Sequence, residues 1–409
     1  MILRYEYLDR LRKLKELQLI KVVTGIRRCG KSTLLMQFQE RLLTEGVSPE
    51  QIISLNFEEL ENENLLDRKA LYDYLLSKLC TDKFTYIFLD EIQKVDEFEK
   101  VVDSLFVKPN VDLYITGSNA YMLSGELATY LSGRYIEINL LPLSFKEYCQ
   151  FLGNDDKEKL FANYLESGGL PYAALLKKNN IPSEDSYVES IYNTVFVKDI
   201  EERQKRKETE SNKRKVTDIP LLKNISSYLS SVIGSPVSMK GIADYLTSSG
   251  RKTSHNTISD YVEALEETYL FYRADRIDIS GKVLLKQSQK YYMVDLGFRK
   301  HILAKRRYDI GFSIENIVFF ELLRRGYRVN IGKAGNTEVD FVALKDGIYE
   351  YYQVSASVAD PSTFEREITP LSNIKDNYQK FILTNDKLGL GNYEGIKVVN
   401  VVDWLLGNN

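Results

Sequence analysis

Residues 25–32, which read GIRRCGKS, constrain the fold of this chain more than any other segment. They match the pattern GxxxxGK[ST] and lie between an apolar run at residues 19–24 and a segment with helical periodicity from Lys31 onward. A strand, a tight loop and a helix in this order predict a phosphate-binding loop, because glycine lets backbone N–H groups point inward and the helix directs its positive end at an anion. A glycine turn before a surface helix is the alternative, and the flanking pattern argues against it.

The residues of this loop have separate roles in the predicted site. Lys31 is expected to reach the β and γ phosphates of ATP, and Ser32 is expected to bind Mg²⁺ through its hydroxyl group. The predicted nucleotide-binding residues are Gly25, Ile26, Arg27, Arg28, Cys29, Gly30, Lys31, Ser32 and Thr33. The sequence therefore predicts a site for ATP and Mg²⁺.

A second apolar segment ends in two acidic residues. Residues 84–93 read FTYIFLDEIQ, the pattern of a buried parallel strand whose acidic pair emerges at its carboxyl end. Phosphates bind at that end of the sheet in open α/β folds. Asp90 is therefore expected to hold Mg²⁺, and Glu91 to orient and activate the attacking water. An exposed strand end is the alternative, but the position downstream of a complete phosphate loop favours catalysis.

Length and composition set outer bounds on the molecule. A chain of 409 residues predicts two or three domains of roughly 150 residues each. The apolar runs are far shorter than the roughly 18 residues that a membrane span needs, and the charged N-terminal segment is unlike a signal peptide, so we expect a cytoplasmic protein without a membrane partner. The three cysteines and two histidines form no zinc or disulfide pattern. Because the net charge is −3, any nucleic-acid surface must be local.

Four polar residues lie next to other predicted strands, and their types alone do not decide what each of them does. Asn56 ends the strand at residues 52–56. Ser118 and Asn119 follow the strand at residues 111–117, where they could cap the next helix or contact the γ phosphate and the water. Arg134 lies between a glycine and a strand, and a single arginine is most often a solvated surface residue.

The ordered motifs GIRRCGKS, LNFE, FLDEIQ, ITGSN, LSGRY and LLPLSFKEY resemble those of the AAA+ ATPases, in particular a widespread prokaryotic group with a C-terminal domain of unknown function. With GGLPYA and VFVKDIEER the resemblance covers nearly the whole chain. It implies that Asn56 is the glutamate-switch partner of Glu91 and that Ser118 or Asn119 is sensor 1. It also implies that Arg134 is an arginine finger supplied to a neighbouring subunit, in a ring of six subunits.

Residues 144–298 are predicted to form a lid, a linker and a winged helix. Residues 144–200 read as helices and resemble the AAA+ lid, without an identifiable second sensor. The basic run at residues 203–215 is a solvated linker or a segment that contacts phosphates. Ser238 and Ser254 are expected to cap two helices, the second of which would be a recognition helix for DNA or part of a protein-docking module. The polar residues expected near its start are Arg251, Lys252, Ser254, His255, Asn256 and Ser259.

The last segment resembles the PD-(D/E)xK nuclease core. Glu315 falls on a predicted helix, Asp340 ends a strand, and Gln353 lies on the next strand. In such nucleases the carboxylates bind Mg²⁺ and a lysine orients water, but Ser355 stands where that lysine should be. Lys333 or Lys345 could take the role instead. An active nuclease and a nuclease-like fold that only binds nucleic acid or protein both stay open.

The sequence thus predicts an α/β protein with a P-loop AAA+ parallel sheet and helical lid, followed by a winged-helix domain and an α/β nuclease-like domain. The expected boundaries are residues 1–143 for the ATPase core, 144–215 for the lid and linker, 216–298 for the winged helix, and 299–409 for the last domain. The favoured function is a Mg²⁺-dependent ring ATPase that translocates or remodels DNA. An ATP-dependent switch or scaffold for a protein partner and an ATP-dependent nuclease are the alternatives.

Overall fold

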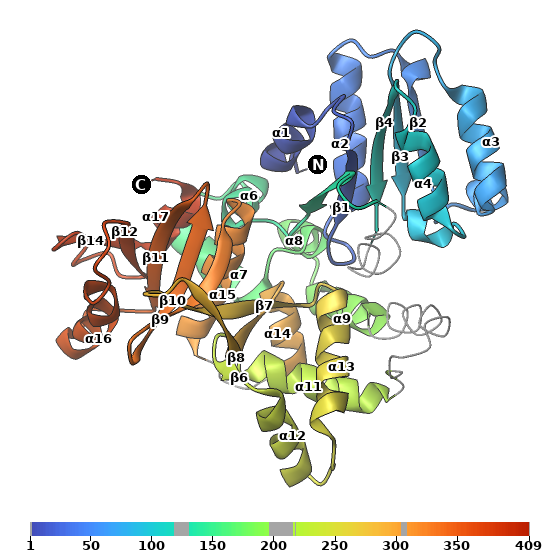
Figure 1. The fold of residues 1–409 in the computed structure, drawn as a ribbon. Coiled ribbons are helices and arrows are strands. Elements are labelled where there is room, and N and C mark those ends of the chain that lie inside the picture. The colour runs from blue at the N-terminus through green and yellow to red at the C-terminus, as the bar shows by residue number, and fades with distance from the viewer. Residues whose placement is uncertain (1, 118–130, 196–215, 217, 304–308, 409) are drawn as a thin grey trace. The chain divides into compact units, whose positions relative to one another are not determined.

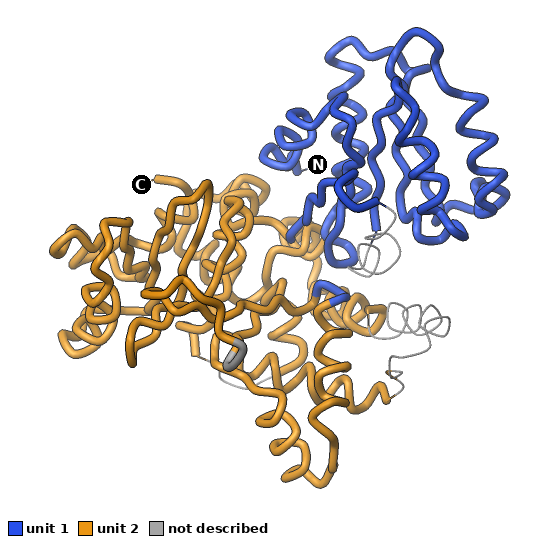
Figure 2. The backbone as a smooth tube through the Cα atoms, viewed as in Figure 1, with its two compact units in different colours: residues 1–141, 267–269 blue, residues 142–266, 270–409 orange. Residues whose placement is uncertain are grey.

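The chain forms two compact units in the computed structural model, which describes residues 2–117, 131–195, 216, 218–303 and 309–408 (Figures 1 and 2). Unit 1 comprises residues 1–141 together with 267–269, and unit 2 comprises residues 142–266 and 270–409. This division is coarser than the predicted boundaries at residues 143, 215 and 298, which stay predictions.

Unit 1 is built on a five-stranded parallel sheet in the order β2-β3-β4-β1-β5. Every residue of β1 and β3 is buried, as expected for parallel strands with both faces covered. The strands are β1 (Ile20–Thr24), β2 (Ile52–Asn56), β3 (Thr85–Asp90), β4 (Val111–Thr116) and β5 (Tyr135–Asn139). The order confirms the predicted α/β class and brings the carboxyl ends of β1, β3 and β4 to one edge.

The helix after the phosphate-binding loop begins at Lys31, where the sequence predicts helical periodicity to begin. The first helix covers Tyr5–Lys13 and buries Tyr7, Leu8 and Leu11. The helices are α1 (Tyr5–Lys13), α2 (Lys31–Thr44), α3 (Arg68–Lys78) and α4 (Phe98–Phe106), and the 3₁₀ turns are Pro49–Gln51, Leu60–Leu65 and Ile92–Lys94. Apolar residues of the strands, α3 and α4 form one core cluster.

Unit 2 contains a group of short helices and a large mixed sheet (Figure 1). Ser144 opens α6 with a capping box, and Ser238 and Ser254 accept the predicted capping hydrogen bonds from the N–H groups of Gly241 and Thr257 at 3.0 and 3.1 Å. The helices are α6 (Phe145–Leu152), α7 (Lys157–Ser167), α8 (Pro171–Lys178), α9 (Glu184–Thr194), α11 (Ile219–Ser231), α12 (Met239–Ser248), α13 (His255–Glu267), α14 (Leu296–Leu303), α15 (Ile310–Arg324), α16 (Pro361–Ser372) and α17 (Val401–Leu406).

The sheet of unit 2 has nine strands in the order β13-β14-β12-β11-β10-β9-β7-β8-β6. The strands are β6 (Pro236–Val237), β7 (Phe271–Asp278), β8 (Val283–Met293), β9 (Arg328–Ala334), β10 (Thr337–Lys345), β11 (Ile348–Ser355), β12 (Gln379–Thr384), β13 (Gly391–Tyr393) and β14 (Ile396–Asn400). Because β7 pairs in parallel with β9, the strands predicted for the winged helix and those predicted for the last domain share one sheet.

None of the helices in the described ranges has both the length and the apolar character that crossing a membrane requires.

Candidate nucleotide-binding site

The loop between β1 and α2 has the backbone that the glycine pattern predicts. Gly25 and Gly30 have φ angles of 137° and 105°. A Cβ atom at Gly25 would lie 2.3 Å from the carbonyl oxygen of Leu140, so glycine is required there by space as well as by conformation. Gly30 immediately precedes α2, so the loop lies at the positive end of that helix.

Lys31 is buried inside this loop, with 5% of its surface exposed. Its ammonium group donates to the carbonyl oxygens of Gly25 at 3.0 Å and Ile26 at 3.4 Å, and lies 3.9 Å from Oε1 of Glu91. The loop carbonyls and Glu91 therefore hold the positive charge next to the backbone that is predicted to bind phosphate.

Ser32 and Asp90 meet across the loop. Burial raises the pKa of Asp90, while hydrogen bonds from Ser32 and Thr116 act in the opposite direction. A serine hydroxyl beside a carboxylate fits Mg²⁺, which takes oxygen ligands and usually one or two protein carboxylates together with substrate phosphates. Ser32 and Asp90 are thus the residues that could hold the ion.

Thr116 at the end of β4 organises the acidic pair. Its hydroxyl donates to Oδ1 of Asp90 and accepts from the N–H of Glu91 at 2.9 Å. Glu91 has a left-handed backbone with φ of 55°, and its Oε2 accepts a hydrogen bond from Nε2 of Gln93. The prediction from sequence missed Thr116 and Gln93, although both lie inside the quoted motifs ITGSN and FLDEIQ.

Asn56 lies beside the acidic pair without a hydrogen bond to Glu91 among the described contacts. It is in register with Asp90 on the neighbouring strand. Its side-chain oxygen accepts from the N–H of Glu58 at 2.9 Å, which fixes the turn after β2. Its role as the partner of Glu91 stays a prediction. Ser118 and Asn119 lie outside the described residues, as does the basic run at residues 203–215.

Arg134 precedes β5, at the edge of the sheet opposite to the loop. Its carbonyl oxygen accepts from the N–H of Ile20, the first residue of β1, whereas the loop follows the last residue of β1. Five strand residues separate the two edges by roughly 16 Å at about 3.3 Å per residue. The guanidinium pairs with Asp103 of α4 and lies over the ring of Phe106. Arg134 is therefore directed away from the loop of its own chain.

Arg4 and Tyr269, which are distant in sequence from the phosphate-binding loop, form hydrogen bonds that stabilise residues in or next to it. The guanidinium of Arg4 donates to the carbonyl oxygens of Leu141 at 2.8 Å and Cys29 at 3.4 Å. Tyr269, in the second segment of unit 1, donates to Oε1 of Glu137 at 3.1 Å.

The same Glu137 oxygen accepts from Thr24, the residue before Gly25, at 2.6 Å. No local pattern in the sequence points to Tyr269, since its role depends on chain segments more than a hundred residues apart.

In unit 2, the residues predicted near the start of α13 are mostly exposed. Arg251 pairs with Asp218, which leaves it partly engaged within the protein. The exposed side chains are Lys252, Ser254, His255, Asn256 and Ser259. They form a polar surface at the beginning of the helix.

The predicted nuclease-like residues converge in unit 2. Gln353 accepts from the N–H of Asp340 at 2.8 Å, and the ammonium group of Lys290 lies 3.0 Å from Glu315 and 3.7 Å from Asp340. Burial, and next the charge of Glu315, raise the pKa of Asp340 to about 8. The lysine in this cluster is thus on β8. Lys345 instead donates to the carbonyl oxygen of Arg325.

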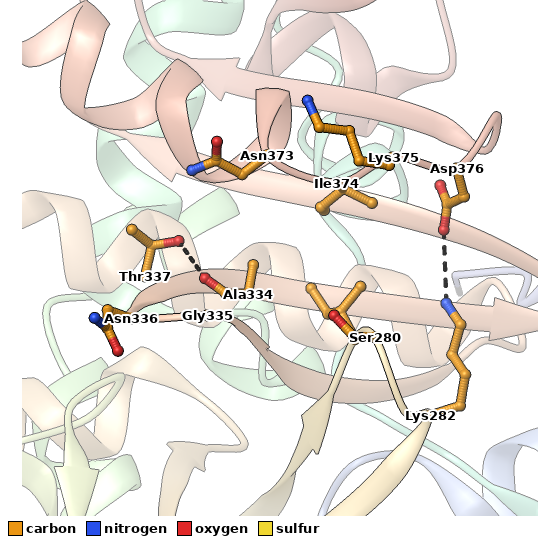
Figure 3. A pocket seen from close by; sticks show the side chains of 11 residues that line it. Ser280, Lys282, Ala334, Gly335, Asn336, Thr337, Asn373, Ile374, Lys375 and Asp376 are labelled. Carbon is orange, nitrogen blue, oxygen red and sulfur yellow. Dashed lines mark hydrogen bonds and ion pairs between the residues drawn. The ribbon is translucent and has the colours of Figure 1, made fainter.

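A separate hollow of about 630 Å³ lies in unit 2, where the β7–β8 and β9–β10 turns face the end of α16 (Figure 3). Lys282 and Asp376 form an ion pair at its rim, with 3.6 Å between Nζ and Oδ2. None of the residues predicted to form a site lines it.

Two segments of the chain match known domains, and two known proteins match nearly the whole chain. Residues 18–149 match the AAA domain, and residues 158–309 match a domain of unknown function, DUF8612. An uncharacterized protein of Haemophilus influenzae is 39% identical over 411 residues, which cover 99% of each chain. An uncharacterized protein of Methanocaldococcus jannaschii is 30% identical over 401 residues, covering 94% of this chain and 85% of its own.

The fold also resembles a solved structure. A Walker-type ATPase of Pyrococcus abyssi aligns over 74% of this chain and 96% of its own, with a TM-score of 0.50 and 16% identity. At this identity the similarity concerns the fold.

Proposed function

This chain belongs to the same family as the uncharacterized proteins of Haemophilus influenzae and Methanocaldococcus jannaschii, and we propose that it is a Mg²⁺-dependent AAA ATPase that forms a ring and acts on DNA. One observation carries the ATPase part of the proposal. Lys31, the Ser32–Asp90 pair and Glu91 meet at one edge of a parallel sheet, beside the positive end of α2.

Each of these groups has a role in the proposed hydrolysis of ATP. The Lys31 ammonium leaves the loop carbonyls and takes phosphate oxygens as its partners, which offsets negative charge on the transferred group. Glu91 accepts the proton of the attacking water, with its carboxylate oriented by Gln93 and its backbone by Thr116. Mg²⁺ held by Ser32 and Asp90 would supply charge to the β and γ phosphates.

The position of Arg134 supports a shared site between subunits. Its distance from the loop of its own chain prevents a contact with the same nucleotide, and its half-exposed guanidinium is available to a neighbouring subunit. The charge of an arginine finger is worth about 10³ to 10⁵ in rate where such residues are known. A closed ring, proposed to be a hexamer, would supply this contact to every site.

The order of elements in unit 2 supports DNA as the substrate. Helix α11, strand β6, helices α12 and α13 and the β7–β8 hairpin follow one another as in a winged helix, and β6 pairs with β8. Polar, exposed residues at the start of α13 are suited to phosphates and base edges. We therefore propose a DNA translocase or remodeller.

A protein partner is the alternative, favoured by the Arg251–Asp218 ion pair, which engages one of the two basic residues before α13. In that case the ATPase would act as a switch or scaffold.

Steady-state ATP hydrolysis with and without DNA separates the two functions. The parent should hydrolyse ATP faster with duplex, single-stranded or branched DNA, and the stimulation should decrease as salt rises because phosphate contacts release counterions. Lys31→Ala is the control for contaminating ATPase. Hydrolysis that none of the three DNA forms stimulates would exclude the DNA motor and favour the protein partner.

A further inference from the structure

Lys290 on β8 lies outside the nucleotide site and is almost fully buried, with 3% of its surface exposed. Its ammonium group lies 3.0 Å from Oε1 of Glu315, 3.0 Å from Oε1 of Glu338 and 3.7 Å from Oδ1 of Asp340. The three carboxylates come from α15 and β10, so that one buried cation joins three elements of unit 2. We call these four residues the Lys290 cluster.

Each of the three carboxylates has another partner besides Lys290. Oε1 of Glu315 also accepts from the hydroxyl of Tyr292 at 2.7 Å. Oε2 of Glu338 accepts from Arg276 at 2.7 Å, and Oδ2 of Asp340 accepts from the N–H of Val354 at 2.9 Å. A bound Mg²⁺ requires near-octahedral oxygen ligands with several waters, and these contacts leave few oxygens directed at a common point.

The surrounding hydrogen bonds fix the cluster further. Gln353 accepts from the N–H of Asp340, and its amide nitrogen donates to the buried Glu367 at 2.8 Å. Gly234 lies against Glu315, since a Cβ atom there would be 3.1 Å from its Oε2. The carboxylates therefore have little room to turn toward another cation.

We infer that the ammonium group of Lys290 is the resident cation of this cluster, in the place where the nuclease-like carboxylates would otherwise hold a divalent metal. Across the residues that the structure describes, no three His, Cys, Asp or Glu side chains are arranged to hold a metal ion. Unit 2 then has no metal-dependent cleavage at Glu315 and Asp340. This inference is independent of the proposed ATPase.

A lysine near two carboxylates also fits a second role, as the missing lysine of a working nuclease. That role requires a metal ion on Glu315 and Asp340 beside the lysine, and a path for a phosphodiester to reach them. The burial of Lys290 and its three simultaneous carboxylate contacts favour the closed ion cluster. Metal-dependent cleavage at Glu315 and Asp340 is the outcome that would contradict the inference.

Counting Mn²⁺ ions on the full chain tests the inference. Nucleotide-free parent and Asp340→Asn would be titrated with Mn²⁺ by calorimetry, and supercoiled DNA would be incubated with each protein and Mn²⁺. We expect the same number of bound ions in both proteins and no cleavage by either. One ion fewer in Asp340→Asn, or cleavage by the parent that Asp340→Asn abolishes, would overturn the inference. Ions at Ser32 and Asp90 cancel in this comparison because both proteins keep that site.

Removing the resident cation provides a second measurement. Lys290→Met keeps the length of the side chain but leaves three carboxylates without their common cation, so the thermal midpoint should fall by several degrees. We expect added Mn²⁺ to raise the midpoint of Lys290→Met by more than that of the parent, because both proteins keep the site at Ser32 and Asp90 and only the variant gains a second one. Lys397→Met, which removes an exposed lysine from β14 of the same sheet, is the matched control.

A Lys290→Met protein as stable as the parent would show that the cluster does not need this cation and would overturn the inference. If the variant does not fold, the loss itself agrees with a structural cation, and the comparison of the parent with Asp340→Asn decides between the two roles.

Discussion

Thr116 and Asp90 share a buried hydrogen bond between neighbouring strands, in which the threonine hydroxyl donates to the carboxylate. Since the same hydroxyl accepts from the N–H of Glu91 at 2.9 Å, one side chain fixes both acidic residues. We predict that Thr116→Val lowers kcat for ATP hydrolysis about tenfold, because a lost buried hydrogen bond costs about 1.4 kcal/mol. Nucleotide affinity should stay close to the parent value.

Thr116→Ser is the matched control for this change. It keeps the hydroxyl and should retain most of the activity. A Thr116→Val protein that hydrolyses ATP at the parent rate would mean that β3 alone positions the acidic pair.

Substitutions at Lys31 and Glu91 should separate binding from chemistry. Lys31→Ala removes the charge that the loop holds and should abolish nucleotide binding or hydrolysis. Glu91→Gln keeps the shape and the contact with Gln93 but removes the base, so it should bind ATP and slow turnover by about 10² to 10⁴. Fluorescent-nucleotide titration and phosphate release measure the two properties. Parent-like turnover by Glu91→Gln would refute its assignment as the base.

Arg134→Ala should lose ATPase activity although it keeps a complete loop. When mixed with Lys31→Ala subunits it should regain part of the activity, because one interface then combines an intact loop with an intact arginine. The readout is phosphate release from the mixture compared with each variant alone. A mixture no more active than the sum of its parts would contradict the shared site.

Tyr269→Phe tests whether the hydrogen bond from Tyr269 to Glu137 stabilises the fold. Removal of the hydroxyl that donates to Glu137 should lower the free energy of unfolding by about 0.5–1.5 kcal/mol, measured by denaturant titration. Tyr5→Phe is the control, since Tyr5 is 64% exposed. Equal stabilities of the parent and Tyr269→Phe would show that the hydroxyl is not needed to hold residues 267–269.

Asp295 should make stability depend on pH. Burial raises the pKa of Asp295 to about 7, against the N–H groups of Gly169, Gly297 and Leu170, which lower it. Because the folded pKa lies above that of the unfolded chain, the contribution of Asp295 is fully present below about pH 4 and is lost as the pH rises through 7.

The thermal midpoint of the parent should therefore fall more between pH 5 and pH 8 than that of Asp295→Asn. An identical pH dependence in the two proteins would show that Asp295 titrates normally.

The sequence predicted the parts of the site that local patterns encode. β2 spans the predicted residues 52–56, and Lys31, Ser32, Asp90 and Glu91 lie together as expected from strand order in phosphate-loop proteins. Lys290 was missed because only the pairing of β7 with β8 and β9 brings it toward residues far along the chain.

Thr116 and Tyr269 were missed for related physical reasons. Thr116 reads as an ordinary β-branched strand residue, and its role follows from the order of β3 and β4 in the sheet. Tyr269 follows a helix of unit 2 and yet belongs to unit 1, because the chain returns to unit 1 at residues 267–269. Local hydrophobic periodicity does not indicate such a return.

The pairing of β7 with β9 limits where this protein can be truncated without exposing a strand of its sheet. A fragment that stops at residue 309, where the DUF8612 match ends, would retain β7 but lose β9 and every strand beyond it. The edge of β7 would then present unpaired N–H and C=O groups, which promote aggregation. The segments on either side of residue 309 are therefore expected to fold only when they are expressed together, so the segment that matches DUF8612 is smaller than the unit that can fold.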